Sequence, residues 1–280
     1  MKVGVIVMLA AIAAVNAHST RADAPQLSPF VANYDVKYGS FSAGTSRTEL
    51  RRTAIPGQWQ IESRTTASGL ARLYFDDTIV QRSTFQLEAD SLRPLSYWSD
   101  DGKKRTSLDF DWDAVRVKGN SQGAPIDIPA ESGLQDAASM QAFVLLRLNG
   151  GSEPGVVAMI EKDRIKYFRY TLLRREKLKT ALGVFDTLVY RSARDGSARE
   201  TLLWYAPALE HATVQAEQRR DGKKQLQIYI KGYRPGTLPV QVRGSVTPVC
   251  PWYFPPRSRY EVSQISSDSK NSICATPSLA

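Results

Sequence analysis

The sequence predicts a mainly β protein, a strongly curved antiparallel sheet or half-barrel of meander topology with one packed helix at about residues 136–148. Three observations predict this fold. Asp-Gly pairs at 101–102, 195–196 and 221–222 are typical of tight turns between antiparallel strands. Apolar and polar residues alternate beside these pairs, as expected for strands with one buried and one solvated face. One segment alone has a clear helical period.

The N-terminus predicts export. Lys2 precedes an uncharged apolar run, and Val15 and Ala17 supply small residues at the two positions that a signal peptidase recognises. We therefore expect residues 1–17 to be a cleavable signal peptide. Cleavage after Ala24 would place Pro25 at a disfavoured position. The alternative, an uncleaved membrane anchor, needs an apolar run of about 20 residues, and this run is shorter.

About a dozen strands follow, joined by short polar connections. They are predicted near residues 30–38, 43–52, 59–66, 78–87, 95–99, 105–113, 115–118, 155–161, 165–174, 184–192, 199–205 and 225–231. Two of these segments, 184–190 and 201–205, are apolar on both faces. We therefore expect both to be covered on both sides, by the rest of the curved sheet and by the helix.

The predicted helix has recognisable ends. Asp136 is placed to cap its N-terminus, and Gly150 and Gly151 follow its last turn. Its apolar residues, which include Met140, Phe143, Val144 and Leu148, fall along one stripe suited to covering a sheet.

The domain organisation follows from where the periodicity stops. We predict a signal peptide at 1–17, an antiparallel β domain at 18–235 and a Pro/Ser-rich, loose tail at 236–280. Cys250 and Cys274 both lie in that tail, and their pairing is left open because the core does not depend on it.

Several short motifs recur in a characteristic order. They are YDVKYG at 34–39, AG at 43–44, LRPLSY at 92–97, FDW at 110–112, QDAAS at 135–139, LGVFDT at 182–187 and LWYAP at 203–207. Over about residues 28–234 this order resembles the secreted proteins grouped as domain of unknown function 3108. The resemblance implies an exported β protein without an assigned activity and, by analogy, an architecture similar to lipoprotein-carrier proteins, with an apolar cavity inside a curved sheet. Glu210 and His211 depart from the apolar pair expected after the LWYAP motif.

The candidate ligand residues are the large apolar side chains expected at such a cavity. Residues 68–75 are too irregular for a strand, so they could form a lid or simply a loop that closes one end of the sheet. The predicted ligand-binding residues are Leu70, Leu73, Tyr74, Phe75, Trp112, Phe143 and Trp204. We expect the two tryptophans and the helix to share one interior.

Several chemistries lack the residues that they need. Excluding His18 at the new N-terminus, His211 is the one histidine, and neither a nucleophile–base pair nor a zinc site can be built from it, so no metal, cofactor or catalytic residue is predicted. Asp109, Asp111 and Asp113 on one strand face could bind a cation or act as a glycosidase pair, but alternation alone also requires polar residues there.

The balance of charge sets the expected partners. Once residues 1–17 are removed, 36 Lys and Arg remain against 28 Asp and Glu, so the mature chain carries about +8. For an exported protein we do not expect nucleic acid as a partner. We therefore predict a periplasmic monomer, without a transmembrane segment after signal cleavage, that is not an enzyme and that binds or carries an apolar ligand, a lipid or an envelope lipoprotein. The alternatives are an envelope hydrolase acting on glycan through Asp109, Asp111 or Asp113, and a structural scaffold without a ligand.

Overall fold

The computed structural model describes residues 27–69, 72, 78–88 and 91–236. The predicted signal peptide at 1–17 lies outside the described residues, and so does the predicted tail from residue 237 onward, with Cys250 and Cys274. In the part of the chain that is described, no helix is both long and apolar enough to cross a membrane.

Residues 30–235 form one antiparallel sheet. In the described ranges its strands are β1 (Phe30–Tyr38), β2 (Phe41–Arg52), β3 (Gln58–Ala67), β4 (Thr78–Glu88), β5 (Ser91–Asp100), β6 (Arg105–Asp111), β7 (Arg116–Ser121), β8 (Ala124–Pro129), β9 (Val156–Glu161), β10 (Arg164–Thr180), β11 (Gly183–Ala193), β12 (Arg199–Ala206), β13 (Ala212–Arg220) and β14 (Lys223–Pro235). Their spatial order is β8-β7-β6-β5-β4-β3-β2-β1-β14-β13-β12-β11-β10-β9, so β1 pairs with β14 and the sheet, with edges β8 and β9, is not closed. The predicted fold class is confirmed.

The predicted turns lie where antiparallel strands meet. Asp221 and Gly222, with φ of 50° and 73°, join β13 to β14, and the Asp101 and Asp195 turns join β5 to β6 and β11 to β12. Strands β8 and β13 were not predicted. Strand β13 alternates small and polar residues rather than large and polar ones, so its pattern is weak, and β8 carries two prolines at the sheet edge, where a missing N–H is tolerated.

The sheet is strongly curved, and two glycines allow adjacent backbones to approach closely. A Cβ at Gly44 in β2 would lie 2.1 Å from the carbonyl oxygen of Thr66, and one at Gly119 in β7 would lie 2.0 Å from that of Ser107. Both glycines have a φ of 150°, which other residues rarely adopt. These positions therefore require glycine for the strands to coil as they do.

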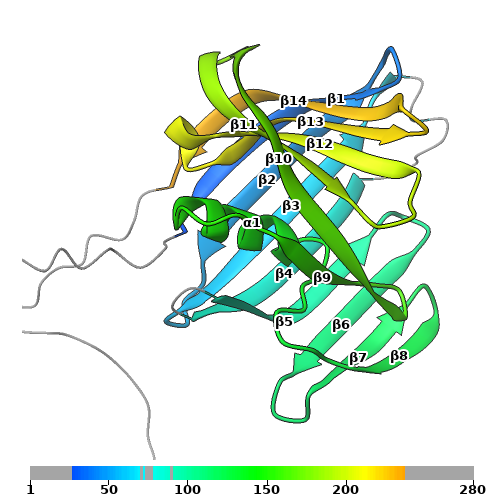
Figure 1. The fold of residues 1–280 in the computed structure, drawn as a ribbon. Helices are drawn as coiled ribbons and strands as arrows, with labels where there is room; N and C mark the ends of the chain where they lie inside the picture. Colours follow the sequence, from blue (N-terminus) through cyan, green and yellow to red (C-terminus); the bar gives the residue numbers. More distant parts are fainter. Residues whose placement is uncertain (1–26, 70–71, 73–77, 89–90, 237–280) are drawn as a thin grey trace, which may run out of the picture. The chain divides into compact units, whose positions relative to one another are not determined.

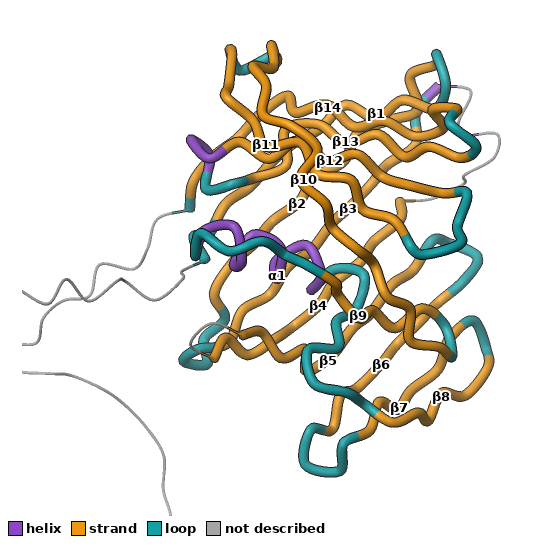
Figure 2. Tube along the Cα trace, in the orientation of Figure 1, coloured by secondary structure: helices purple, strands orange, loops and turns teal. Residues whose placement is uncertain are grey.

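The single helix of the described residues, α1 (Ser139–Asn149), lies on the concave side of the sheet, where β9 and β10 curl across it (Figures 1 and 2). It packs against β4 and β5. Among its residues only Gln141 is exposed, and Ala142, Val144, Leu145, Leu146 and Leu148 are buried. The buried part of the helix surface is therefore wider than the single predicted stripe, because the curved sheet surrounds the helix on more than one side.

One apolar cluster joins the helix to both flanks of the sheet. Trp204 of β12, Trp59 of β3 and Leu145 of α1 belong to it, and Trp112 and Phe143 pack against it while half-buried. Trp204 and the helix thus belong to one cluster, with Trp112 packed against it, but Trp204 alternates with Leu203 along β12 and points to the opposite side of that strand from Leu203.

Candidate functional site

The sequence-predicted ligand residues divide into two groups. Leu70, Leu73, Tyr74 and Phe75 lie outside the described residues. Trp204 belongs to the core cluster, and Trp112 and Phe143 are partly buried and pack against it. Their role in binding a ligand stays a prediction. Both indoles are hydrogen-bonded to protein: Trp112 Nε1 donates to the Pro94 carbonyl and Trp204 Nε1 donates to Glu176 Oε1, each at 2.6 Å.

The segment before the helix bridges the two flanks of the sheet. The backbone N–H of Gln135 donates to Ala158 in β9, and the N–H of Ile160 donates back to Gln135. The side-chain amide of Gln135 donates to the Leu92 carbonyl in β5 at 3.0 Å. Strands far apart in the sheet order are thus joined across its concave side by one residue.

Asp136 anchors the helix in the core, and it is fully buried. Its Oδ1 accepts from the backbone N–H groups of Ala138 and Ser139, each at 2.8 Å, and its Oδ2 accepts from the Ser83 hydroxyl in β4 at 2.6 Å. The Ser139 hydroxyl accepts from the Asp136 N–H in return. Asp136 thus accepts from the N–H groups at the start of the helix, as predicted, but the helix itself begins at Ser139, and Ala138 at its N-cap position makes no side-chain hydrogen bond. The Asp-x-x-Ser spacing is the signal for the reciprocal pair of hydrogen bonds.

Burial raises the pKa of the Asp136 carboxyl to about 6, because an ionised group is disfavoured away from water. The hydrogen bonds from Ser83 and from the backbone of Ser139 and Ala138 act in the opposite direction and limit the rise. The group is enclosed, so its role here is to hold the helix against β4.

The other end of the helix meets the β12–β13 connection, where the sequence departs from the resembled family. The 3₁₀ turn Pro207–Leu209 is followed by Glu210 and His211, with φ of 53° and 57°. This geometry brings His211 Nδ1 to 2.7 Å from Asn149 Oδ1, to which it donates a hydrogen bond. Burial lowers the pKa of His211, so the imidazole acts as a neutral link between helix and sheet.

Beyond the helix, the concave face carries a polar row on one flank. Its members are direct cross-strand neighbours from β2 to β7. They are Thr48, Ser63, Gln81, Ser99, Thr106 and Ser121. Cross-strand partners point to the same face, and this face also carries Ala32 and the buried core. The Thr48 and Ser63 hydroxyls are 2.9 Å apart and those of Thr106 and Ser121 are 3.3 Å apart. Ser63, Gln81, Ser99 and Thr106 are half-buried.

An apolar row continues on the other flank. It runs across β1 and β14 to β10 and consists of Val36, Ile228, Ala216, Leu203, Tyr190 and Leu172. Leu172, Leu203 and Ile228 are only half-buried. The concave face beyond the helix is therefore amphipathic, with hydroxyl and amide groups on β2–β7 and aliphatic groups on β1 and β10–β14.

Buried tyrosines lie close to the apolar row. Tyr190 and Tyr205 meet edge to face, with ring centroids 5.9 Å apart. Burial raises the pKa of Tyr170 to about 12. Burial also raises the pKa of Tyr205 well above its usual value, with added repulsion from Tyr170, Tyr190 and Tyr34. These phenols stay neutral and contribute apolar rings and hydroxyls.

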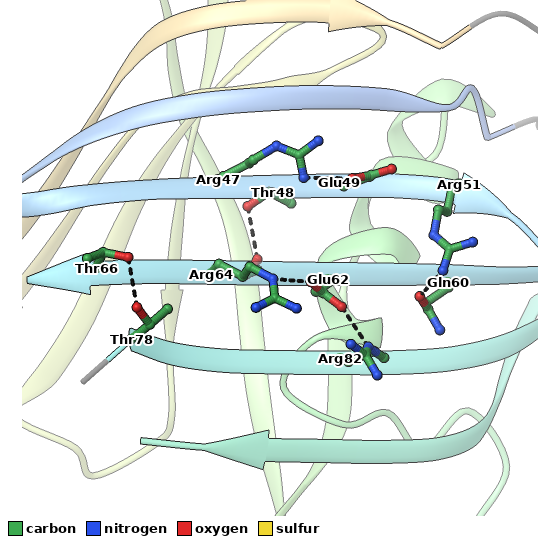
Figure 3. Close-up of polar contacts among 11 residues, drawn as sticks. Arg47, Thr48, Glu49, Arg51, Gln60, Glu62, Arg64, Thr66, Thr78 and Arg82 are labelled. Carbon is green, nitrogen blue, oxygen red and sulfur yellow. Dashed lines mark hydrogen bonds and ion pairs between the residues drawn. The ribbon is translucent and has the colours of Figure 1, made fainter. Parts of the chain in front are cut away.

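The convex face is charged, with arginine–glutamate pairs within single strands and the Arg82–Glu62 pair between β4 and β3 (Figure 3). Glu62 accepts from Arg64 Nε at 2.5 Å and from Arg82 Nε at 2.6 Å. Burial opposes its ionisation, but the two arginines outweigh this and lower the pKa of Glu62. Beside this network, strands β3–β6 form a shallow depression of about 480 Å³ that includes the exposed Trp98. A second depression of about 520 Å³, at the β5–β6 and β7–β8 turns, is lined by polar residues such as Lys104 and Asn120.

The acidic residues considered for hydrolysis lie on this convex face. Asp109, Asp111 and Asp113 are exposed, and Asp111 Oδ1 accepts from the Ala114 N–H at 2.9 Å. Asp109 is the one carboxylate among the residues that line the Trp98 depression, whereas glycoside hydrolysis uses a facing pair. Among the described residues no group of three His, Cys, Asp or Glu side chains is placed to hold a metal ion.

Comparison with solved structures finds distant likenesses. One is a "putative lipoprotein" from Parabacteroides distasonis, with 11% identity and a TM-score of 0.33. Another is a "putative exported protein" with a YmcC-like fold from Bacteroides fragilis, with 8% identity and a TM-score of 0.34. Each alignment covers 75% of this chain and 97% of the other. These likenesses are too remote to support an argument about this chain.

Comparison with protein families is decisive, whereas no curated protein sequence matches the chain. Residues 33–228 match the family described as "Protein of unknown function (DUF3108)". The matched region runs from β1 into β14 and contains α1, so it spans nearly the whole described sheet. The chain therefore belongs to the DUF3108 family, as the order of its short motifs predicts.

Proposed function

We propose that this protein is an exported, non-enzymatic binding or carrier protein for a lipid-like ligand, which lies against the concave face of the sheet beyond α1. The observation that carries the proposal is the division of that face into the polar row and the apolar row. An amphipathic ligand would place its acyl portion along Leu172, Leu203 and Ile228. Its polar portion would meet the hydroxyl groups of the opposite flank.

Two further features support the proposal. The apolar run and the cleavage site at residues 1–17 favour export to the periplasm, where a lipid or a lipidated protein would be the partner. Half-buried aliphatic groups on a concave face retain apolar area that a ligand can still cover, at about 25 cal/mol per Å².

The experiment is co-purification followed by probe displacement. Native mass spectrometry of protein isolated from the envelope should detect bound lipid. N-terminal sequencing of the same sample should begin at His18. An apolar fluorescent probe such as N-phenyl-naphthylamine should bind to the delipidated protein and should be displaced by oleate.

A pair of variants locates the site. Leu203→Ser should weaken probe binding by about 3- to 10-fold, because it removes half-exposed apolar area from the concave face. Val184→Ser is the control, since Val184 is 63% exposed near the end of the β10–β11 hairpin and lies outside the apolar row. A wild-type protein that carries no lipid and binds no probe would instead be a scaffold without a ligand.

A further inference from the structure

The depression on the convex face has the composition of a small-molecule site. It crosses strands β3–β6, and it exists because short side chains occupy its centre while long ones border it. Thr84, Ser96 and Ser107 are short, whereas Arg82, Trp98 and Asp109 project around them. Tyr97 and Leu108 are buried on the concave side, so they contribute mainly backbone to the floor.

Trp98 is the unusual member of this surface. Its neighbours along one cross-strand line are Arg82 in β4 and Ser107 in β6, which are ordinary residues for a solvated face. Trp98 is nevertheless 37% exposed, although burying a tryptophan is strongly favourable. The Arg82 guanidinium lies over the ring, with its central carbon 5.9 Å from the ring centroid, close to the limit for a cation–π contact, so a ligand would stack on the part of the indole that stays exposed.

The polar groups around Trp98 are held in place before any ligand binds. Glu62 receives the Nε groups of both Arg64 and Arg82, which fixes the two guanidinium groups on one carboxylate. They border the depression as donors, Asp109 borders it as an acceptor, and Thr84, Ser96 and Ser107 supply hydroxyls that act as either.

We propose that this depression binds a neutral saccharide, with one apolar face of a sugar ring stacked on Trp98. The mixture of charges decides the ligand class: Arg64 and Arg82 border the depression but are both paired with the adjacent Glu62, and Asp109 adds a carboxylate to the border, so no unpaired cluster of positive charge selects an anion. A sugar presents C–H groups on its ring face and hydroxyls around its edge, which matches one exposed indole surrounded by donors and acceptors. The site lies on the opposite face of the sheet from the lipid site and does not depend on it.

The test is titration of the purified protein with soluble maltotetraose, cellotetraose and chitotetraose, followed by calorimetry and tryptophan fluorescence. At least one of these probes should bind with a dissociation constant of about 0.1–1 mM, which is typical of a shallow single-ring site. Trp98→Ala should weaken that binding by about tenfold, and Trp98→Phe should restore part of it because an aromatic face remains. Asp109→Asn should weaken binding less, since an amide oxygen still accepts.

Phe41→Ala is the matched control, because Phe41 is an aromatic residue that is 68% exposed and lies outside the depression. It should leave the affinity unchanged, and thermal unfolding of each variant checks that the fold is retained. The proposal is overturned if none of the three probes binds up to about 10 mM, or if binding survives Trp98→Ala intact. It is also overturned if only sulfated or phosphorylated sugars bind, because the site would then select charge.

Discussion

At the scale of single residues, Asp136 combines two opposing requirements. Its carboxylate caps the helix through the N–H groups of Ala138 and Ser139, and this favours the ionised form. Its position in the core favours the neutral form, and burial is the larger effect, since the pKa rises to about 6. The native state therefore retains a proton on Asp136 at pH values where the unfolded chain has already released it.

This difference predicts a stability that falls as pH rises. The unfolded carboxyl titrates near pH 3.9 and the folded one near 6, so the contribution of Asp136 is fully present below about pH 4 and is lost between about pH 4 and 6. The loss is of the order of 2–3 kcal/mol. Asp136→Asn should remove this dependence, because a neutral amide still accepts from the helix N–H groups and can donate to Ser83. Urea unfolding from pH 4 to 8 measures it.

The matched control for this titration is Asp113→Asn, which changes an exposed carboxylate on the convex side. Its stability should follow that of the wild type at every pH. Buried ion-paired groups act in the opposite sense: hydrogen bonds from Lys224 and Arg219 outweigh burial and lower the pKa of Glu217, so its contribution is lost as pH falls below about 4.5. Parallel curves for wild type and Asp136→Asn between pH 4 and 7 would contradict the role of Asp136.

At the scale of elements, α1 is defined by what surrounds it. Its N-terminus is tied to β4 through Ser83 and its C-terminus to the β12–β13 connection through His211. Six of its 11 residues are buried, and only Gln141 is exposed. An isolated helix of 11 residues is marginal in water, so most of its stability comes from packing inside the curved sheet.

Truncating a buried leucine of this helix should therefore be costly. Leu145 is 5% exposed and belongs to the apolar cluster that joins both flanks of the sheet. Leu145→Ala should lower the free energy of unfolding by about 2–5 kcal/mol, because it removes buried area and leaves a cavity. Gln141→Ala, at the exposed position of the same helix, should change it by less than about 0.5 kcal/mol. Equal effects of the two substitutions in chemical denaturation would show that α1 does not pack inward.

At the scale of the whole molecule, the sheet is held together by the pairing of its first and last strands. Strands β1 and β14 are neighbours along Phe30–Tyr38, so the ends of the described chain lie together, and Gly236 donates its N–H to the Pro29 carbonyl at 2.6 Å. The strands and the core cluster that the structure describes lie within residues 27–235.

A mature chain that ends after Gly236 should consequently unfold within about 2 °C of the full-length protein in a thermal scan. A chain that ends after Ile228 is the control, because it loses the half of β14 that pairs with Phe30–Asp35 of β1. That shorter chain should lose cooperative unfolding. A large fall in melting temperature for the Gly236 truncation would mean that residues beyond 236 contribute to the fold.

The sequence alone determined the fold class, most strands, the Asp-Gly turns and the ends of the helix. These features depend on neighbours a few residues apart. Alternation indicates which face of a strand is buried, and the Asp136-x-x-Ser139 spacing indicates a cap. Strand β13 was missed because its inward residues are small, so its burial comes from its partner strands and not from its own pattern. The family was also determined by local motifs in a fixed order.

Only the tertiary structure decided which residues meet. The pairing of β1 with β14, the bridge from Gln135 to β5 and β9, and the cross-strand rows of the concave face all join residues far apart in the sequence. Trp98 was not predicted as a site residue, since its exposure depends on short side chains in three neighbouring strands. Trp112, Phe143 and Trp204 were predicted as ligand residues because large apolar side chains suit both a cavity and a core. Whether such side chains line a cavity or fill a core depends on how tightly the sheet curls around its helix, and no local sequence pattern indicates this.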